Sequence, residues 1–157
     1  MEEYRANVAA LLVNEEGLLL VCERLNNKGA WQFPQGGVDE GEAHDAALPR
    51  EVQEEVGLLP EDYVVEESRG GYRYEFPPDV RANKPAHKAK FVGQEQRYYL
   101  CRVKAGAREV DLMQEPREFR QAQWIRPEEF ELSWVPGFKK TVYREVMRDF
   151  FGVELSE

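Results

Sequence analysis

Three glutamates within five residues are the most informative chemical feature of this sequence. On a helix with about 3.6 residues per turn, Glu51, Glu54 and Glu55 place their carboxylates within an arc of about 100°. Like charges this close repel each other, at roughly 0.2–0.5 kcal/mol per pair, unless a cation lies between them. Hard oxygen ligands suit Mg²⁺, with Mn²⁺ as the alternative. The spacing indicates a divalent-metal site, although Glu54 and Glu55 taken alone are typical of a solvated helix face.

These carboxylates need a helix to position them. The apolar repeat Leu48, Val52 and Val56 predicts a helix over residues 45–56, with Gly57 just past its C-terminus. We expect the apolar side to pack on the core and the carboxylates to lie on the opposite side.

Pro49 is a departure from a regular helix. It lacks the amide that would bond to residue 45, and its ring crowds that carbonyl. We therefore expect the helix to begin late, near Ala46, or to kink, with the carboxylates after the proline unaffected.

The glutamates belong to a longer pattern. It consists of Gly36, five residues, Glu42, seven residues and then Arg50-Glu51-Val52-Gln53-Glu54-Glu55-Val56-Gly57-Leu58. Seven fixed residues and two apolar positions match the Nudix box, for which a chance match is on the order of one in 10⁵. The chain therefore resembles the Nudix hydrolases, which cut phosphoanhydride bonds in nucleotide-linked polyphosphates.

The resemblance implies a fold and a set of roles. The implied fold is an α/β/α sandwich around a mixed sheet, with this loop and helix carrying the metal site. The implied metal ligands are the Gly36 carbonyl, Glu51, Glu54 and Glu55. Glu42 and Arg50 are implied as the supporting pair.

Segments outside the box resemble one Nudix subgroup, the bacterial RNA pyrophosphohydrolases and asymmetric diadenosine tetraphosphate hydrolases. They are Tyr4–Val8, Trp31–Gly37, Gly93–Gln96, Phe138-Lys139 and Tyr143-Arg144. In that subgroup a late glutamate joins the metals or activates the water, and Glu118 is the matching position. The alternative for Glu118 is a solvated carboxylate beside Arg117 and Arg120.

Substrate contacts are expected from residues near these segments. Arg5, Arg24 and Lys139 are candidates to bind phosphate, although isolated basic residues are more often surface charges. Gln35 lies in the expected substrate-proximal loop. Tyr74 and Phe138 are candidates to stack on a base, with core packing as the alternative for both; the expected substrate-binding set is Arg5, Arg24, Gln35, Tyr74, Phe138 and Lys139.

The resemblance and the residues together suggest a mechanism. Two or more Mg²⁺ ions, held by the glutamates, activate a water, and Glu54 or Glu118 accepts its proton, with Arg50 in support. The expected substrates are a 5′-triphosphorylated RNA end, a dinucleoside polyphosphate or both. A dedicated diadenosine tetraphosphate hydrolase without an RNA role, and a non-catalytic nucleotide sensor, remain open alternatives.

Composition sets limits on the function. The 157 residues suit one domain over residues 1–157, and a net charge of −9 argues against general binding of DNA or other polyanions. The apolar runs are too short for a membrane span, and residues 1–5 lack the features of a secretory signal, so the cytoplasm is the expected location. Cys22 and Cys101 lie in apolar runs and are expected to be buried free thiols. The oligomeric state is not specified.

The remaining elements alternate between strands and helices, which predicts mixed α/β architecture. The expected elements are a hairpin from residues 8–13 and 18–22, a loop over 25–41, strands at 63–67 and 71–76, a surface loop through Lys90, strands at 96–103 and 121–125, and a closing helix over 141–151.

Overall fold

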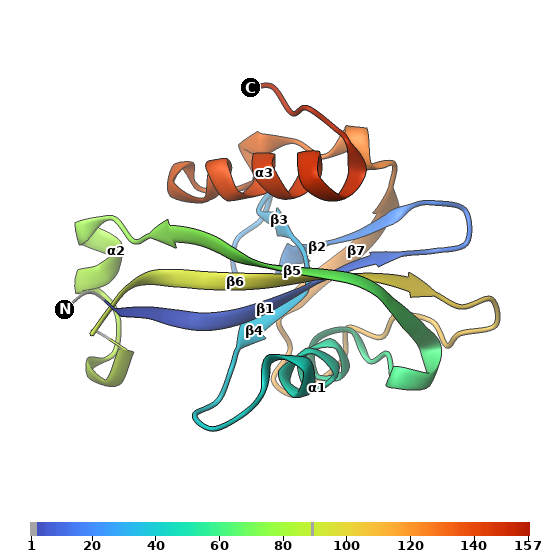
Figure 1. The fold of residues 1–157 in the computed structure, drawn as a ribbon, viewed down its shortest axis with the longest axis horizontal. Coiled ribbons are helices and arrows are strands. Elements are labelled where there is room, and N and C mark those ends of the chain that lie inside the picture. The colour runs from blue at the N-terminus through green and yellow to red at the C-terminus, as the bar shows by residue number, and fades with distance from the viewer. Residues whose placement is uncertain (1–2, 89) are drawn as a thin grey trace.

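A computed structural model describes residues 3–88 and 90–157 of the chain. Met1 and Glu2, which contributed to the prediction about the N-terminus, lie outside these residues. One helix covers each face of a central sheet, so the layers are helix, sheet and helix (Figure 1). The α/β sandwich implied by the resemblance is therefore confirmed.

The sheet is mixed, with the strand order β3-β2-β1-β6-β5, while β4 pairs with β1 and β7 pairs with β2. Strands β1 and β6 run parallel, and the other pairs are antiparallel. The strands are β1 (Glu3–Val13), β2 (Leu19–Arg24), β3 (Trp31–Gln32), β4 (Gln35–Gly37), β5 (Tyr63–Glu75), β6 (Phe91–Val103) and β7 (Phe119–Ile125). The helices are α1 (His44–Val56), α2 (Pro78–Ala82) and α3 (Lys140–Phe151).

Strand β1 is buried on both faces because it lies between the two helical layers. Successive side chains point to opposite faces of a strand. Val8, Ala10 and Leu12 accordingly pack in the apolar cluster that includes α1, and Ala9 and Leu11 pack in the cluster that includes α3. This arrangement explains the continuous apolar run in the sequence.

Both long helices end as the sequence predicts. Gly57 follows α1 with φ of 75°, and Gly152 follows α3 with φ of 66°, which is the left-handed conformation that glycine tolerates. The late start expected from Pro49 is wrong: α1 begins at His44 and includes the proline. Packing of the apolar side of α1 outweighs the loss of one helical hydrogen bond.

Several other expectations are corrected. The two strands predicted between residues 63 and 76 form the single strand β5, in which irregular register after Val65 and after Arg69 absorbs the break in pattern. Strands β3 and β4 interrupt the loop expected over residues 25–41, and α2 and a 3-10 turn at Ala86–Lys88 interrupt the expected surface loop. The hairpin of β1 and β2, the strands β6 and β7, and the closing helix are confirmed.

The two cysteines are buried and free, as expected. In the part of the chain that the structure describes, none of the helices has the length and apolar character needed to cross a membrane.

Candidate active site

The glycine-rich strand β4 brings the start of the loop against helix α1. Gly36 pairs with Val8 of β1, and a Cβ atom at Gly36 would lie 2.0 Å from Cδ and Oε2 of Glu51. A Cβ at Gly37 would lie 2.2 Å from Nη2 of Arg5. The absence of side chains at both positions therefore lets the backbone approach one carboxylate and one guanidinium.

The three box glutamates differ in their environments. Glu51 and Glu55 are each 9% exposed, whereas Glu54 is exposed. The expectation that all three lie opposite the apolar side is therefore wrong. On a helical projection Glu55 falls next to Leu48, so the acidic and apolar sides adjoin and two carboxylates are buried between helix and sheet.

Glu55 carries the strongest perturbation of the cluster. Its Oε1 accepts a hydrogen bond of 2.8 Å from the Gln35 backbone amide. Burial, together with the charges of Glu51, Glu118 and Glu54, raises the pKa of Glu55 to about 9. The influence of Glu118 on this pKa shows that Glu118 lies close to Glu55, although the two residues are far apart in the sequence.

Arg50 connects the cluster to the loop. Its Nε and Nη2 donate to the two carboxylate oxygens of Glu42 at 2.9 and 2.8 Å, and Nη2 also donates to the Gly37 carbonyl. Its Nη1 donates to Glu51 at 2.8 Å and lies 3.4 Å from Glu54. The hydrogen bonds from Arg50 lower the pKa of Glu42 to about 2. Arg50 thus holds the loop against the helix.

The donor set fits a divalent cation. Glu51, Glu54 and Glu55 all offer carboxylate oxygens, two of them in a buried setting where uncompensated negative charge is costly. Within residues 3–88 and 90–157, no group of three or more Asp, Glu, His or Cys side chains is already arranged as a metal site. Glu54 instead contacts Arg50.

Glu118 is exposed, and its backbone carbonyl accepts a hydrogen bond from the Leu25 amide at 3.0 Å. Among the described residues, neither flanking arginine forms an ion pair with it. Arg117 donates to backbone carbonyls, and Nε of Arg120 lies 3.5 Å from Glu23. The flanking arginines therefore do not pair with Glu118, whereas its exposure fits the alternative of a solvated carboxylate.

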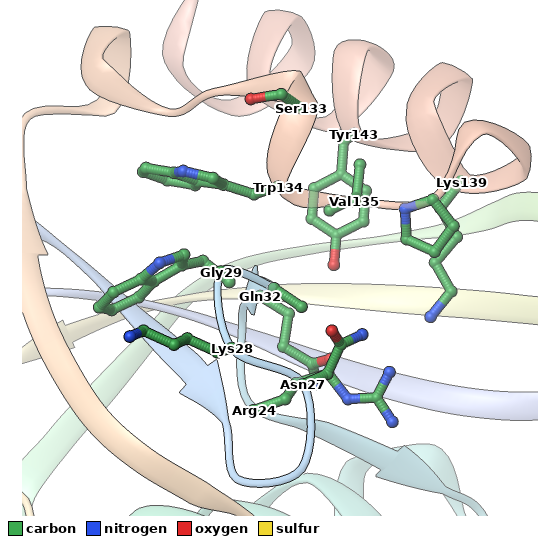
Figure 2. A pocket seen from close by; sticks show the side chains of 13 residues that line it. Arg24, Asn27, Lys28, Gly29, Gln32, Ser133, Trp134, Val135, Lys139 and Tyr143 are labelled. Atoms are coloured by element: carbon green, nitrogen blue, oxygen red, sulfur yellow. The ribbon is translucent and has the colours of Figure 1, made fainter.

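A cavity of about 400 Å³ lies between the loop after β2 and the start of α3. Figure 2 shows the cationic groups of Arg24 and Lys139 on the same side of this pocket, with the Tyr143 hydroxyl directed toward them. Trp31 and Trp134 form another wall, with ring centroids 5.9 Å apart. The pocket combines positive charge with aromatic surface.

Lys139 lies in an unusual position for a lysine. Burial, together with repulsion from Arg24 and Lys84, lowers its pKa to about 8. Its Nζ lies 5.5 Å from the ring centre of Tyr74 and 5.8 Å from that of Phe138. Among the described residues, no carboxylate lies within ion-pair distance of Lys139 or Arg24, so both remain available to an anion.

The surroundings of three residues bear on their expected contacts with the substrate. Tyr74 is 7% exposed and packs in the core, which favours the packing alternative, while Phe138 is half-buried. The Gln35 side chain accepts a hydrogen bond from Gln96, so its contact with the cluster is made by its backbone.

The sequence interpretation missed Trp134 and Tyr143 as pocket residues, because their proximity to Trp31 depends on how α3 packs. It also missed Glu23, which is 4% exposed. A charged residue directly after an apolar strand was the available signal.

Comparison with known proteins agrees with this geometry. The NUDIX domain family matches residues 3–150. RNA pyrophosphohydrolase from Acinetobacter baylyi is 38% identical over 150 residues, covering 94% of this chain and 88% of the relative. Nudix hydrolase 25 from Arabidopsis thaliana is 36% identical over 152 residues, covering 94% and 86%.

Solved structures show the same fold. A C. elegans Ap4A hydrolase in a binary complex superposes with a TM-score of 0.66 at 19% identity, covering 94% of this chain and 98% of that one. Nudix hydrolases generally need divalent metal ions, in keeping with the carboxylate cluster. By its family match, its relatives and its fold, this chain belongs to the Nudix family and is a Nudix hydrolase.

Proposed function

We propose that this enzyme is a pyrophosphohydrolase acting on 5′-triphosphorylated RNA ends, on dinucleoside polyphosphates, or on both. The observation that carries the proposal is the burial of Glu51 and Glu55 against the glycine strand, in a chain that also forms the cationic pocket of Arg24 and Lys139. The buried carboxylates suit a divalent cation, and the pocket suits a phosphate chain attached to a base. The names of the relatives support this substrate class.

Glu51, Glu54, Glu55, Glu118 and the Gly36 carbonyl are the proposed ligands of two or more Mg²⁺ ions, with Mn²⁺ as the alternative. Such ions, when bound, lower the pKa of a coordinated water and offset charge on the phosphate oxygens. Glu54 or Glu118, which are both exposed, accepts the proton of the attacking water. The water oxygen forms the new bond to phosphorus, and the bridging oxygen of the anhydride leaves.

The cations have a separate role in binding. Arg24 and Lys139 line the pocket and are proposed to bind phosphate, as is Arg5, which lies against Gly37. A net charge of −9 disfavours a long nucleic-acid track, so recognition is confined to one phosphorylated end and a base or two. We retain the cytoplasm as the proposed location and one domain as the proposed organisation.

The decisive experiment compares kcat/KM for diadenosine tetraphosphate and for a short 5′-triphosphorylated RNA, in Mg²⁺. A large preference for RNA supports an RNA 5′-end pyrophosphohydrolase. A large preference for the dinucleotide supports the dedicated hydrolase, the second candidate favoured by the structural match. Binding of both ligands in isothermal titration without turnover of either would support a sensor and refute the proposal.

Glu54→Gln tests the mechanism within the same assay. We expect kcat to fall by roughly 100-fold or more at saturating Mg²⁺, because a proton acceptor and a metal ligand are lost together. Glu66→Gln, which affects an exposed ion pair with Arg102, is the matched control and should retain wild-type turnover. Near-wild-type kcat for Glu54→Gln would remove Glu54 from the mechanism.

A further inference from the structure

Glu23 is a buried carboxylate at the end of β2 that has no part in the chemistry above. It is 4% exposed, and both of its oxygens are engaged. Oε2 accepts from the Gly29 backbone amide at 2.7 Å, and Oε1 accepts from the Gln121 side-chain amide at 2.7 Å. Nε of Arg120 lies 3.5 Å from Oε1. A buried carboxylate with this many donors is costly to disturb.

The first of these contacts holds the loop of residues 24–30, which forms one wall of the pocket. Arg24, Asn27, Lys28 and Gly29 all line the cavity, and Figure 2 shows them on this loop. The loop is closed by a hydrogen bond of 2.9 Å from the Arg24 amide to the Ala30 carbonyl. The Glu23 carboxylate adds a second closure at Gly29. It therefore fixes the loop that carries the Arg24 guanidinium.

The other contacts reach strand β7, beside Glu118. Glu23 pairs in register with Gln121, and Arg24 pairs with Phe119 across an irregularity in the ladder. The Leu25 amide bonds to the carbonyl of Glu118 itself. The pocket loop and the Glu118 segment thus meet at one place, and the Glu23 carboxylate bonds to both sides of it.

We propose that Glu23 is a positioning residue that ties the loop of residues 24–30 to β7, and so sets Arg24 and Glu118 relative to the box glutamates. This inference rests on the proposed function, because it assigns Glu23 a role through two residues of that site. The hydrogen bonds from Gln121 and Gly29 lower the pKa of Glu23, so the carboxylate is ionised at neutral pH.

The test exchanges the partners of one hydrogen bond. Gln121→Glu places a carboxylate against the Glu23 carboxylate, so the hydrogen bond is lost while the size of the side chain is kept. The double variant Glu23→Gln with Gln121→Glu restores a donor and an acceptor at the same place, and the amide oxygen introduced at position 23 can still accept from Gly29. Glu66→Gln is the control. For each variant, kcat and KM are measured separately for triphosphorylated RNA, and hydrogen exchange is followed at residues 24–30 and 117–120.

For Gln121→Glu we expect kcat/KM to fall by roughly tenfold or more, with contributions from KM through Arg24 and from kcat through Glu118. Exchange should become faster in both segments. The double variant should return kcat/KM to within about threefold of the wild type, because the hydrogen bond is restored with its partners exchanged. If Gln121→Glu does not fold, the double variant alone gives the comparison with the wild type.

Two results would overturn the proposal: wild-type kcat, KM and exchange in Gln121→Glu, or a double variant with restored exchange but unrestored kcat/KM. If the wild-type protein hydrolyses neither substrate, the proposed function fails. The exchange data then still decide whether Glu23 ties the two segments together.

Discussion

Replacing Gly36 with alanine tests whether the close approach of β4 to Glu51 matters for catalysis. The added Cβ would lie 2.0 Å from Cδ of Glu51, whereas ordinary contact begins at 3.4 Å, so the carboxylate must retreat by about 1.4 Å. The backbone itself is not strained, because Gly36 is not among the described glycines with positive φ. Glu51 is buried and held by Arg50, which limits where it can go.

A displacement of about 1 Å at a catalytic group can cost roughly 100-fold in rate. We therefore expect Gly36→Ala to lower kcat/KM about 100-fold, which corresponds to about 2.7 kcal/mol of transition-state stabilisation. Overpacking should also lower the free energy of unfolding by about 1–3 kcal/mol. Titration with Mg²⁺ should show weaker metal binding, as a higher Mg²⁺ concentration at half-maximal rate, because Glu51 is a proposed ligand.

The matched control is Gly137→Ala, whose added Cβ meets no atom within 4 Å and whose φ is not positive. It should keep wild-type kcat/KM and stability. Hydrolysis rates in Mg²⁺ and thermal unfolding are measured for both variants. If Gly36→Ala retains kcat/KM within threefold of Gly137→Ala, the close approach is not required and the argument fails.

Three further predictions concern charge. Because burial raises the pKa of Glu55 to about 9, the metal-free protein should lose stability as pH rises from about 5 to 9, at roughly 1.4 kcal/mol per pH unit. Glu55→Gln or added Mg²⁺ should flatten this pH dependence of stability. A free energy of urea unfolding that does not change with pH in the metal-free protein would contradict the prediction. Because Lys139 has a pKa of about 8, it loses its charge as pH passes 8, and KM should rise. Lys139→Arg stays charged and should show no such rise. Identical profiles of KM against pH for the two proteins would show that Lys139 does not bind substrate. Glu42→Gln replaces one of the two carboxylate oxygens that accept from Arg50, and should lower the urea-unfolding midpoint relative to Glu66→Gln. Equal midpoints would show that the contact contributes nothing to stability.

The sequence predicted the elements whose patterns are long and regular. Helix α1 follows from apolar periodicity and Gly57, and the hairpin of β1 and β2 follows from two aliphatic runs joined by a short polar turn; all these signals act locally. Strands β3 and β4 were missed because they are two or three residues long and are formed by backbone pairing rather than by side-chain type. The continuation of α1 through Pro49 was missed for a similar reason, because tertiary packing decides whether a helix tolerates a proline.

The candidate site was predicted in part. The box pattern identified the glutamates, and the resemblance identified Glu118, which the structure brings close to Glu55. The burial of Glu51 and Glu55 was not anticipated, because it depends on the approach of β4 to the helix. The pocket walls Trp31 and Trp134 meet only after α3 packs on the sheet.

The parallel pairing of β1 with β6 has a consequence for the order in which the chain folds. The first strand, Glu3–Val13, finds its longest partner only in Phe91–Val103, with partners running from Glu3↔Phe91 to Val13↔Arg102. Contacts this distant in sequence require closure of a long loop, which slows folding. During synthesis, β1 can pair early only with β2 and β4, and one of its edges stays open until β6 emerges. The ribosome must therefore release well over half of this chain before the strand that supports the catalytic loop is enclosed on both sides.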